Sequence, residues 1–74
     1  MSPDKLAYMA NQIGRFFAHQ PHDQAVASVE AHLRRFWDPR MRQAIIASLG
    51  DPGLRLDPIV RTAVERLAEV QPAS

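Results

Sequence analysis

The sequence predicts an all-α fold, a small bundle of four short helices without strands. Helix-start signals stand at four places: Ser2-Pro3, Pro21-His22-Asp23, Asp38-Pro39 and Asp57-Pro58. Ser and Asp side chains accept hydrogen bonds from the free N–H groups of a first turn, and Pro at the first helical position loses no bond. Apolar residues then recur at helical spacing, and no segment alternates with a period of two.

The first helix is expected over residues 3–18, with Ser2 as its N-cap and Asp4 in its positive first turn. Its apolar stripe consists of Leu6, Met9, Ala10, Ile13, Phe16 and Phe17. Gly14 lies inside this helix, where Gly costs about 1 kcal/mol relative to Ala. Such a Gly often allows another backbone to approach closely.

The second helix is expected over residues 22–37, after a connection that begins at His19. Its apolar stripe consists of Val26, Val29, Leu33, Phe36 and Trp37. It ends at Asp38-Pro39, because a residue that precedes Pro is pushed out of the α region. The same dipeptide begins a third helix, predicted over residues 39–49.

Apolar residues cover so much of the third helix that it is expected to be nearly enclosed: Met41, Ala44, Ile45, Ile46, Ala47 and Leu49. Gly50 suits a C-terminal cap, and residues 51–53 have the composition of a turn. Residues 54–56 form a short extended bridge to a fourth helix over residues 58–70. Its apolar residues are Ile59, Val60, Ala63, Val64, Leu67 and Val70, and residues 71–74 are expected to be a frayed tail.

Length and charge restrict the function. The 74 residues make one domain, 1–74, and a domain of this size buries only about 60% of its unfolded surface, so a partner could supply part of its stability. The net charge of +1 is lower than that of most dedicated nucleic-acid binders. We expect a cytoplasmic protein without membrane contact, because no apolar run approaches the ~20 residues that span a bilayer and no secretion signal is recognisable.

No catalytic, cofactor-binding or metal-binding residue is predicted. The chain has no Cys and no glycine-rich phosphate loop. His19 and His22 have the spacing of one helical turn, but Pro21 disfavours a regular helix between them, so we expect two exposed loop histidines. A metal would also need further ligands, for which the nearby candidates are Asp23 and His32. The chain is therefore not expected to be an enzyme by itself.

Residues 34–42 hold the only Trp and four of the nine basic residues. Arg and Trp anchor many protein interfaces, so the predicted partner-binding residues here are Arg34, Arg35, Trp37, Arg40 and Arg42. Two of these Arg residues fall in the positive first turn of the third helix, where cations are disfavoured, which indicates a role outside the domain. Alternatively, the Arg side chains are solvated or cap the end of the second helix, and the aromatic residues close the bundle. Of the aromatic residues, Phe36 is expected in the core, whereas Trp37 is expected to point outward.

A second predicted contact strip consists of Asn11, Gln12 and Arg15 on the first helix, roughly opposite the apolar stripe. Amide side chains both donate and accept hydrogen bonds, which suits docking against the backbone of a partner. The alternative is a solvated face, and the residue pattern fits both interpretations.

Three runs of this sequence resemble a known family. They are Tyr8 to Phe17 (YMANQIGRFF); His32-Leu33 followed by Phe36 to Arg42 (FWDPRMR); and Leu56 to Val60 (LDPIV) with Ala63 and Leu67. These runs resemble the delta subunit of NAD-dependent formate dehydrogenase, and the likeness covers nearly the whole chain.

The resemblance implies a small accessory subunit of a cytosolic complex that oxidises formate and reduces NAD. It implies a molybdenum or tungsten pterin, iron–sulfur clusters, FMN and NAD in the other subunits, and none of these cofactors in this chain. The implied partners are the catalytic (alpha) subunit and, through it, the diaphorase-type subunits. Two alternatives are a maturation factor that aids insertion of the metal cofactor and a nucleic-acid-binding bundle that uses the Arg residues.

Overall fold

The computed structural model describes residues 2–70, which form four α-helices, one 3₁₀ helix and no strand. The elements are α1 (Pro3–Phe17), α2 (His22–Phe36), α3 (Pro39–Ala47), η1 (Ser48–Gly50) and α4 (Pro58–Val70). The predicted all-α class with four helices and no strands is confirmed for this part of the chain. The predicted tail, residues 71–74, lies outside the described residues, as does the side chain of Val70.

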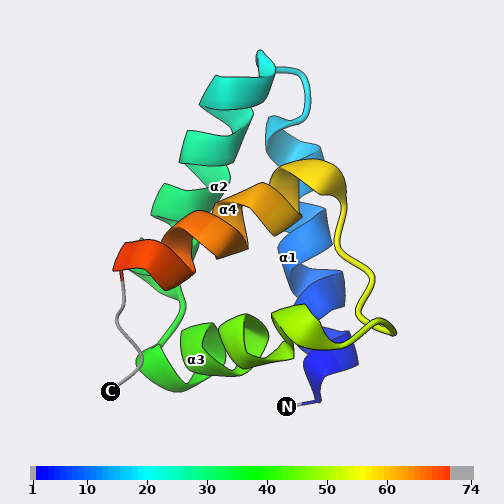
Figure 1. Ribbon diagram of the computed structural model, residues 1–74. Helices are drawn as coiled ribbons and strands as arrows, with labels where there is room; N and C mark the ends of the chain where they lie inside the picture. Colours follow the sequence, from blue (N-terminus) through cyan, green and yellow to red (C-terminus); the bar gives the residue numbers. More distant parts are fainter. Residues whose placement is uncertain (1, 71–74) are drawn as a thin grey trace.

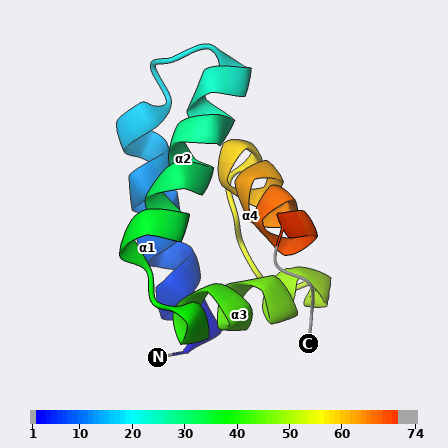
Figure 2. The ribbon, with the colours of Figure 1, turned by 90° about the vertical axis from the view of Figure 1, so that its left-hand side faces the viewer.

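The helices form two layers (Figures 1 and 2). α1 and α2 run in opposite directions and pack against each other, and α4 lies across both. α3 crosses one end of this arrangement and contacts α1 and α4. One long side of the α1–α2 pair therefore faces α4.

Two side-chain caps explain where α1 and α3 begin. Ser2 accepts a hydrogen bond from the N–H of Lys5 at 3.3 Å, and Asp38 accepts one from the N–H of Met41 at 2.9 Å. Both caps satisfy a backbone donor that the first turn leaves free. α2 begins after Pro21 without a side-chain cap.

The ends of the helices differ slightly from the prediction. α1 and α2 each end one residue early, at Phe17 and Phe36, and α3 ends at Ala47 rather than near residue 49. The chain tightens there into η1, and no described residue has a positive φ, so Gly50 is not a left-handed cap.

The core consists of side chains from every α-helix and from the bridge before α4. Its members are Leu6, Ala7, Ala10, Val26, Val29, Leu33, Trp37, Ile45, Leu54, Val60, Ala63, Val64 and Leu67. Gly14 lies where α1 meets α4, and a Cβ atom there would come within 2.4 Å of Cγ2 of Val60. The close approach predicted at this Gly is thus made by a side chain and not by a backbone.

The prediction of a nearly enclosed third helix is wrong. Only Ile45 of α3 is fully buried, and Ala47 is exposed. α3 crosses the end of the bundle, so a single side of it can reach the core. Its other apolar residues remain partly exposed.

The described helices are compactly arranged. Their Cα radius of gyration is 11.1 Å, close to the ~11 Å typical of a folded chain of this length. Within residues 2–70, no helix combines the length and hydropathy needed to cross a membrane.

Candidate partner-binding surface

Arg42 is bonded to the end of α2. Its guanidinium donates hydrogen bonds to the carbonyl oxygen of Arg34, at 3.1 Å, and to that of Trp37. These carbonyls belong to the negative end of the helix, where a cation is favourable. The Nε atom of Arg42 is buried and has no hydrogen-bond partner within the described part of the chain. Arg42 therefore caps α2, as one of the two interpretations of the sequence predicted.

The other three Arg residues of the segment are exposed. Arg34 forms an ion pair with Glu30, one turn earlier on α2. For Arg35 and Arg40, no ion pair or side-chain hydrogen bond is found among residues 2–70. Two of the four Arg side chains are thus available to an external partner without breaking an internal bond.

The predicted orientations of Phe36 and Trp37 are both wrong. Trp37 is only 6% exposed and belongs to the core, whereas Phe36 is 68% exposed. Trp37 is the residue at which the chain leaves α2, with φ −85° and ψ 140°. Because it no longer follows the helical period, its side chain turns into the core, and Phe36 stays on the outside of the last turn.

Phe16 shows the same pattern on α1. It was expected in the apolar stripe but is 73% exposed, while its neighbour Phe17 is half-buried. Adjacent residues of a helix point about 100° apart, so two neighbouring aromatic side chains cannot both face a narrow core. The doublets Phe16-Phe17 and Phe36-Trp37 were the signal in the sequence for one outward aromatic residue each.

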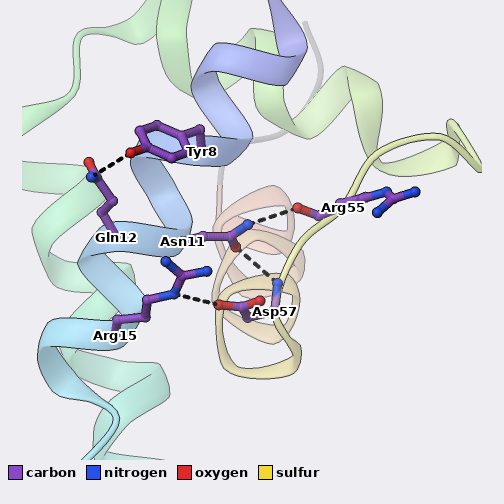
Figure 3. A network of polar contacts seen from close by, with 6 residues as sticks. All are labelled: Tyr8, Asn11, Gln12, Arg15, Arg55 and Asp57. Atoms are coloured by element: carbon purple, nitrogen blue, oxygen red, sulfur yellow. Dashed lines mark hydrogen bonds and ion pairs between the residues drawn. The ribbon is translucent and has the colours of Figure 1, made fainter.

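Two residues of the strip Asn11, Gln12 and Arg15 contact the bridge before α4, although Gln12 and Arg15 are exposed (Figure 3). Asn11 donates a hydrogen bond to the carbonyl of Arg55 and accepts one from the N–H of Asp57, both at 2.9 Å. Arg15 lies 3.9 Å from the carboxylate of Asp57. These contacts hold the bridge before α4 against α1, which the sequence did not indicate.

Gln12 behaves differently from the rest of the strip. Its amide donates to the hydroxyl of Tyr8 at 3.2 Å, and both side chains are exposed. Gln12 also lines a hollow on the other side of α1, described next.

An open hollow of about 500 Å³ lies between α1 and α2, and we call it the aromatic groove. Its lining consists of Met9, Gln12, Ile13, Phe16, Phe17, His32, Phe36 and Trp37. Gly14 faces α4. Phe16 lies two positions after Gly14, so its side chain points about 200° away from Gly14 around the axis of α1. The groove therefore opens on the side of the α1–α2 pair that α4 does not cover.

Four rings connect the two helices across the groove. Phe16 meets Phe17 edge to face, with ring centroids 5.1 Å apart, and Phe17 lies 6.4 Å from His32. His32 in turn packs against Phe36 at 4.6 Å. Such contacts fix ring positions and leave the outer faces of Phe16 and Phe36 uncovered.

The groove continues into a second, shallower hollow that shares Phe17, His32 and Phe36 with it and adds Arg35. Among residues 2–70, no Asp or Glu lines either hollow. Most of the lining is apolar or aromatic, and its polar members are Gln12, Ser28, His32 and Arg35.

The candidate metal ligands do not come together. Within residues 2–70, no group of three or more His, Cys, Asp or Glu side chains could hold a metal ion. His19 and His22 are both exposed, at the connection between α1 and α2.

Comparison with protein families matched residues 5–64 to the model described as NADH-dependent formate dehydrogenase delta subunit FdsD. The match covers well over half of the 74 residues. The chain belongs to this delta-subunit family. Neither a search of curated proteins nor a search of solved structures gave a match. Membership of the delta-subunit family means that the chain is a subunit of a formate dehydrogenase, and hence part of a complex.

Proposed function

We propose that the chain is a non-catalytic accessory subunit that binds the catalytic (alpha) subunit of a cytoplasmic formate dehydrogenase and stabilises the assembled enzyme. Formate oxidation and NAD reduction then take place in the other subunits. Family membership supports the assignment to this enzyme. The accessory role is supported by the surface, which carries an open and largely apolar groove with two exposed aromatic side chains.

The observation that carries the proposal is the exposure of Phe16 and Phe36 beside one groove. Both side chains are more than two-thirds exposed, at 73% and 68%. Contiguous exposed apolar surface with a polar edge is typical of protein-binding sites in otherwise soluble domains. Large aromatic residues also supply much of the binding energy at such sites.

Iron–sulfur clusters do not fit this chain, because they require thiolates and the sequence has no Cys. We therefore assign the clusters to other subunits. The proposal places the molybdenum or tungsten pterin and FMN in the catalytic and diaphorase-type subunits as well.

A nucleic-acid-binding role is less well supported. Arg42 caps α2 and Arg34 is paired with Glu30, so the four Arg residues do not form one free cationic cluster. Phosphate binding depends on several such cations acting together.

Omission of the chain from an otherwise complete expression system tests the proposal against the maturation alternative. If the chain stabilises the assembly, the enzyme made without it loses activity faster on heating, and its metal content per catalytic subunit is unchanged. The chain is also present in active enzyme at a fixed ratio by native mass spectrometry. A loss of bound metal, with the chain absent from active enzyme, contradicts the proposal and supports a maturation factor.

A further inference from the structure

We infer that the aromatic groove binds an amphipathic helix of the catalytic subunit, which places apolar side chains between Phe16 and Phe36 and a carboxylate against Arg35. This inference rests on the proposed function, because it names the surface and the partner chemistry that the accessory role requires.

The position of the groove favours a helix as its occupant. The groove lies between α1 and α2 and has no lining residue from α4. The two helices that border it run in opposite directions (Figures 1 and 2). An amphipathic helix buries its apolar face well in a channel between two helices. Phe16 on α1 and Phe36 on α2 would then contact this helix from both sides.

The lining favours a largely apolar contact surface. Met9, Ile13 and Phe17 are partly buried and packed against the core, so the floor of the groove is held in place. The rings of Phe17, His32 and Phe36 support one another across it. A groove that is already ordered loses little conformational entropy when a partner binds.

The positive charge of Arg35 indicates that the partner helix carries an acidic residue at this edge of the groove. Arg35 lines the shallower hollow, and no carboxylate of residues 2–70 lines either part of the surface. The neighbouring Arg34 already has Glu30 as its partner, but no described carboxylate lies within ion-pair distance of Arg35. Arg forms strong, directional pairs with carboxylates, so an Asp or Glu of the partner helix completes this edge.

The same charges argue against a second copy of this chain as the occupant. Two copies that met face to face at this groove would offer no Asp or Glu to either Arg35, because none of the described ones lines the groove. A charge that is covered at an interface without a partner is unfavourable. A different and acidic partner fits better.

Binding of the full-length chain to the purified catalytic subunit, measured by calorimetry, tests the inference. We expect Phe16→Ala, Phe36→Ala and Arg35→Glu each to raise Kd about tenfold or more, as anchors of an interface do. The controls are Arg66→Ala and Arg66→Glu, a truncation and a charge reversal at an exposed Arg of α4 that does not line the groove. Both controls are expected to bind within about twofold of the unchanged chain.

Two failures are distinguishable. If the unchanged chain does not bind the catalytic subunit, the proposed function is wrong and the inference falls with it. If it binds, but the groove variants bind as tightly as the controls, only the inference is wrong.

A photoreactive benzoylphenylalanine in place of Phe16 identifies the occupant in the same mixture. The expected product joins the chain to a segment of the catalytic subunit with apolar residues three and four positions apart and at least one Asp or Glu. A product that joins two copies of this chain, or a segment without a carboxylate, overturns the inference.

Discussion

At the scale of single residues, neighbours in the sequence have opposite roles. Phe36 lies on the surface and Trp37 lies in the core, although they are adjacent. The reason is local: α2 ends at Phe36, and the backbone becomes extended at Trp37. A side chain that supports the fold and one that is free to bind a partner thus stand next to each other.

The different burial of Phe36 and Trp37 predicts different effects of their substitution on the free energy of unfolding. Trp37→Ala is expected to lower the free energy of unfolding by about 3–5 kcal/mol, because it removes a large side chain from the core. Phe36→Ala is expected to change it by no more than about 0.5 kcal/mol, as for other exposed positions. Urea unfolding followed by circular dichroism measures both. Equal destabilisation by the two substitutions would contradict the orientations described here.

Arg42 gives a second prediction at this scale. Arg42→Met keeps most of the apolar stem but removes the hydrogen bonds to the carbonyls of Arg34 and Trp37. Hydrogen bonds that involve a charged group contribute about 1.5–3 kcal/mol, and Arg42 is only half-buried, so a loss of about 1–2 kcal/mol is expected. The exposed neighbour Arg40 is the control: Arg40→Met should leave the urea midpoint nearly unchanged. A larger loss from Arg40→Met than from Arg42→Met would show that the cap is unimportant.

At the scale of the elements, the junction between α1 and the bridge before α4 depends on one amide. Asn11 uses both ends of its side chain, on Arg55 and on Asp57, and Arg15 adds an ion pair to the same segment (Figure 3). These contacts join residues more than forty positions apart in the sequence. They fix the direction in which the chain enters α4.

Asn11→Ala is therefore expected to loosen the bridge. The N–H of Asp57 loses its acceptor, so its hydrogen exchange should accelerate more than that of amides in the middle of α2. The stability of the whole chain should fall by about 1–3 kcal/mol, the usual cost of leaving a partly buried polar group without its bond. Exchange measured by nuclear magnetic resonance reports both effects. Unchanged exchange at Asp57 after the substitution would mean that the bridge is held by other contacts.

The sequence predicted the elements well because their signals are local. Ser2 and Asp38 mark helix starts through hydrogen bonds to residues three positions on, and such caps are visible in the sequence. The side of each helix that faces the core depends on how the helices cross, which is not a local property. For this reason α3 was expected to be enclosed although it lies across the end of the bundle.

The candidate site was harder to predict than the fold. Arg35 and Arg40 were expected on the surface and are exposed, but Arg42 and Asn11 are engaged within the chain. The exposed rings of Phe16 and Phe36 went unrecognised, because a helical stripe assigns every apolar residue to one face. For Phe16-Phe17, the packing of α1 against α2 and α4 decides which ring turns outward; for Phe36-Trp37, the end of α2 at Phe36 decides it.

At the scale of the whole molecule, the proposed interface would occupy a substantial part of the chain's surface. A stable interface of standard size covers about 800 Å² of each partner, which is about one sixth of the 4892 Å² accessible surface. A domain of this size is also marginally stable alone. Binding to the catalytic subunit would therefore stabilise the chain as well as the enzyme.

Hydrogen exchange by mass spectrometry, on the chain with and without the catalytic subunit, tests the central claim most directly. A partner that binds only the folded chain, at a free concentration of about 100 times Kd, slows exchange through global unfolding about a hundredfold. We predict this slowing in core peptides of the unchanged chain and a much smaller one in the variant with both Phe16→Ala and Phe36→Ala. Unchanged exchange in the original chain, or equal slowing in the double variant, would contradict binding of the catalytic subunit through the aromatic groove.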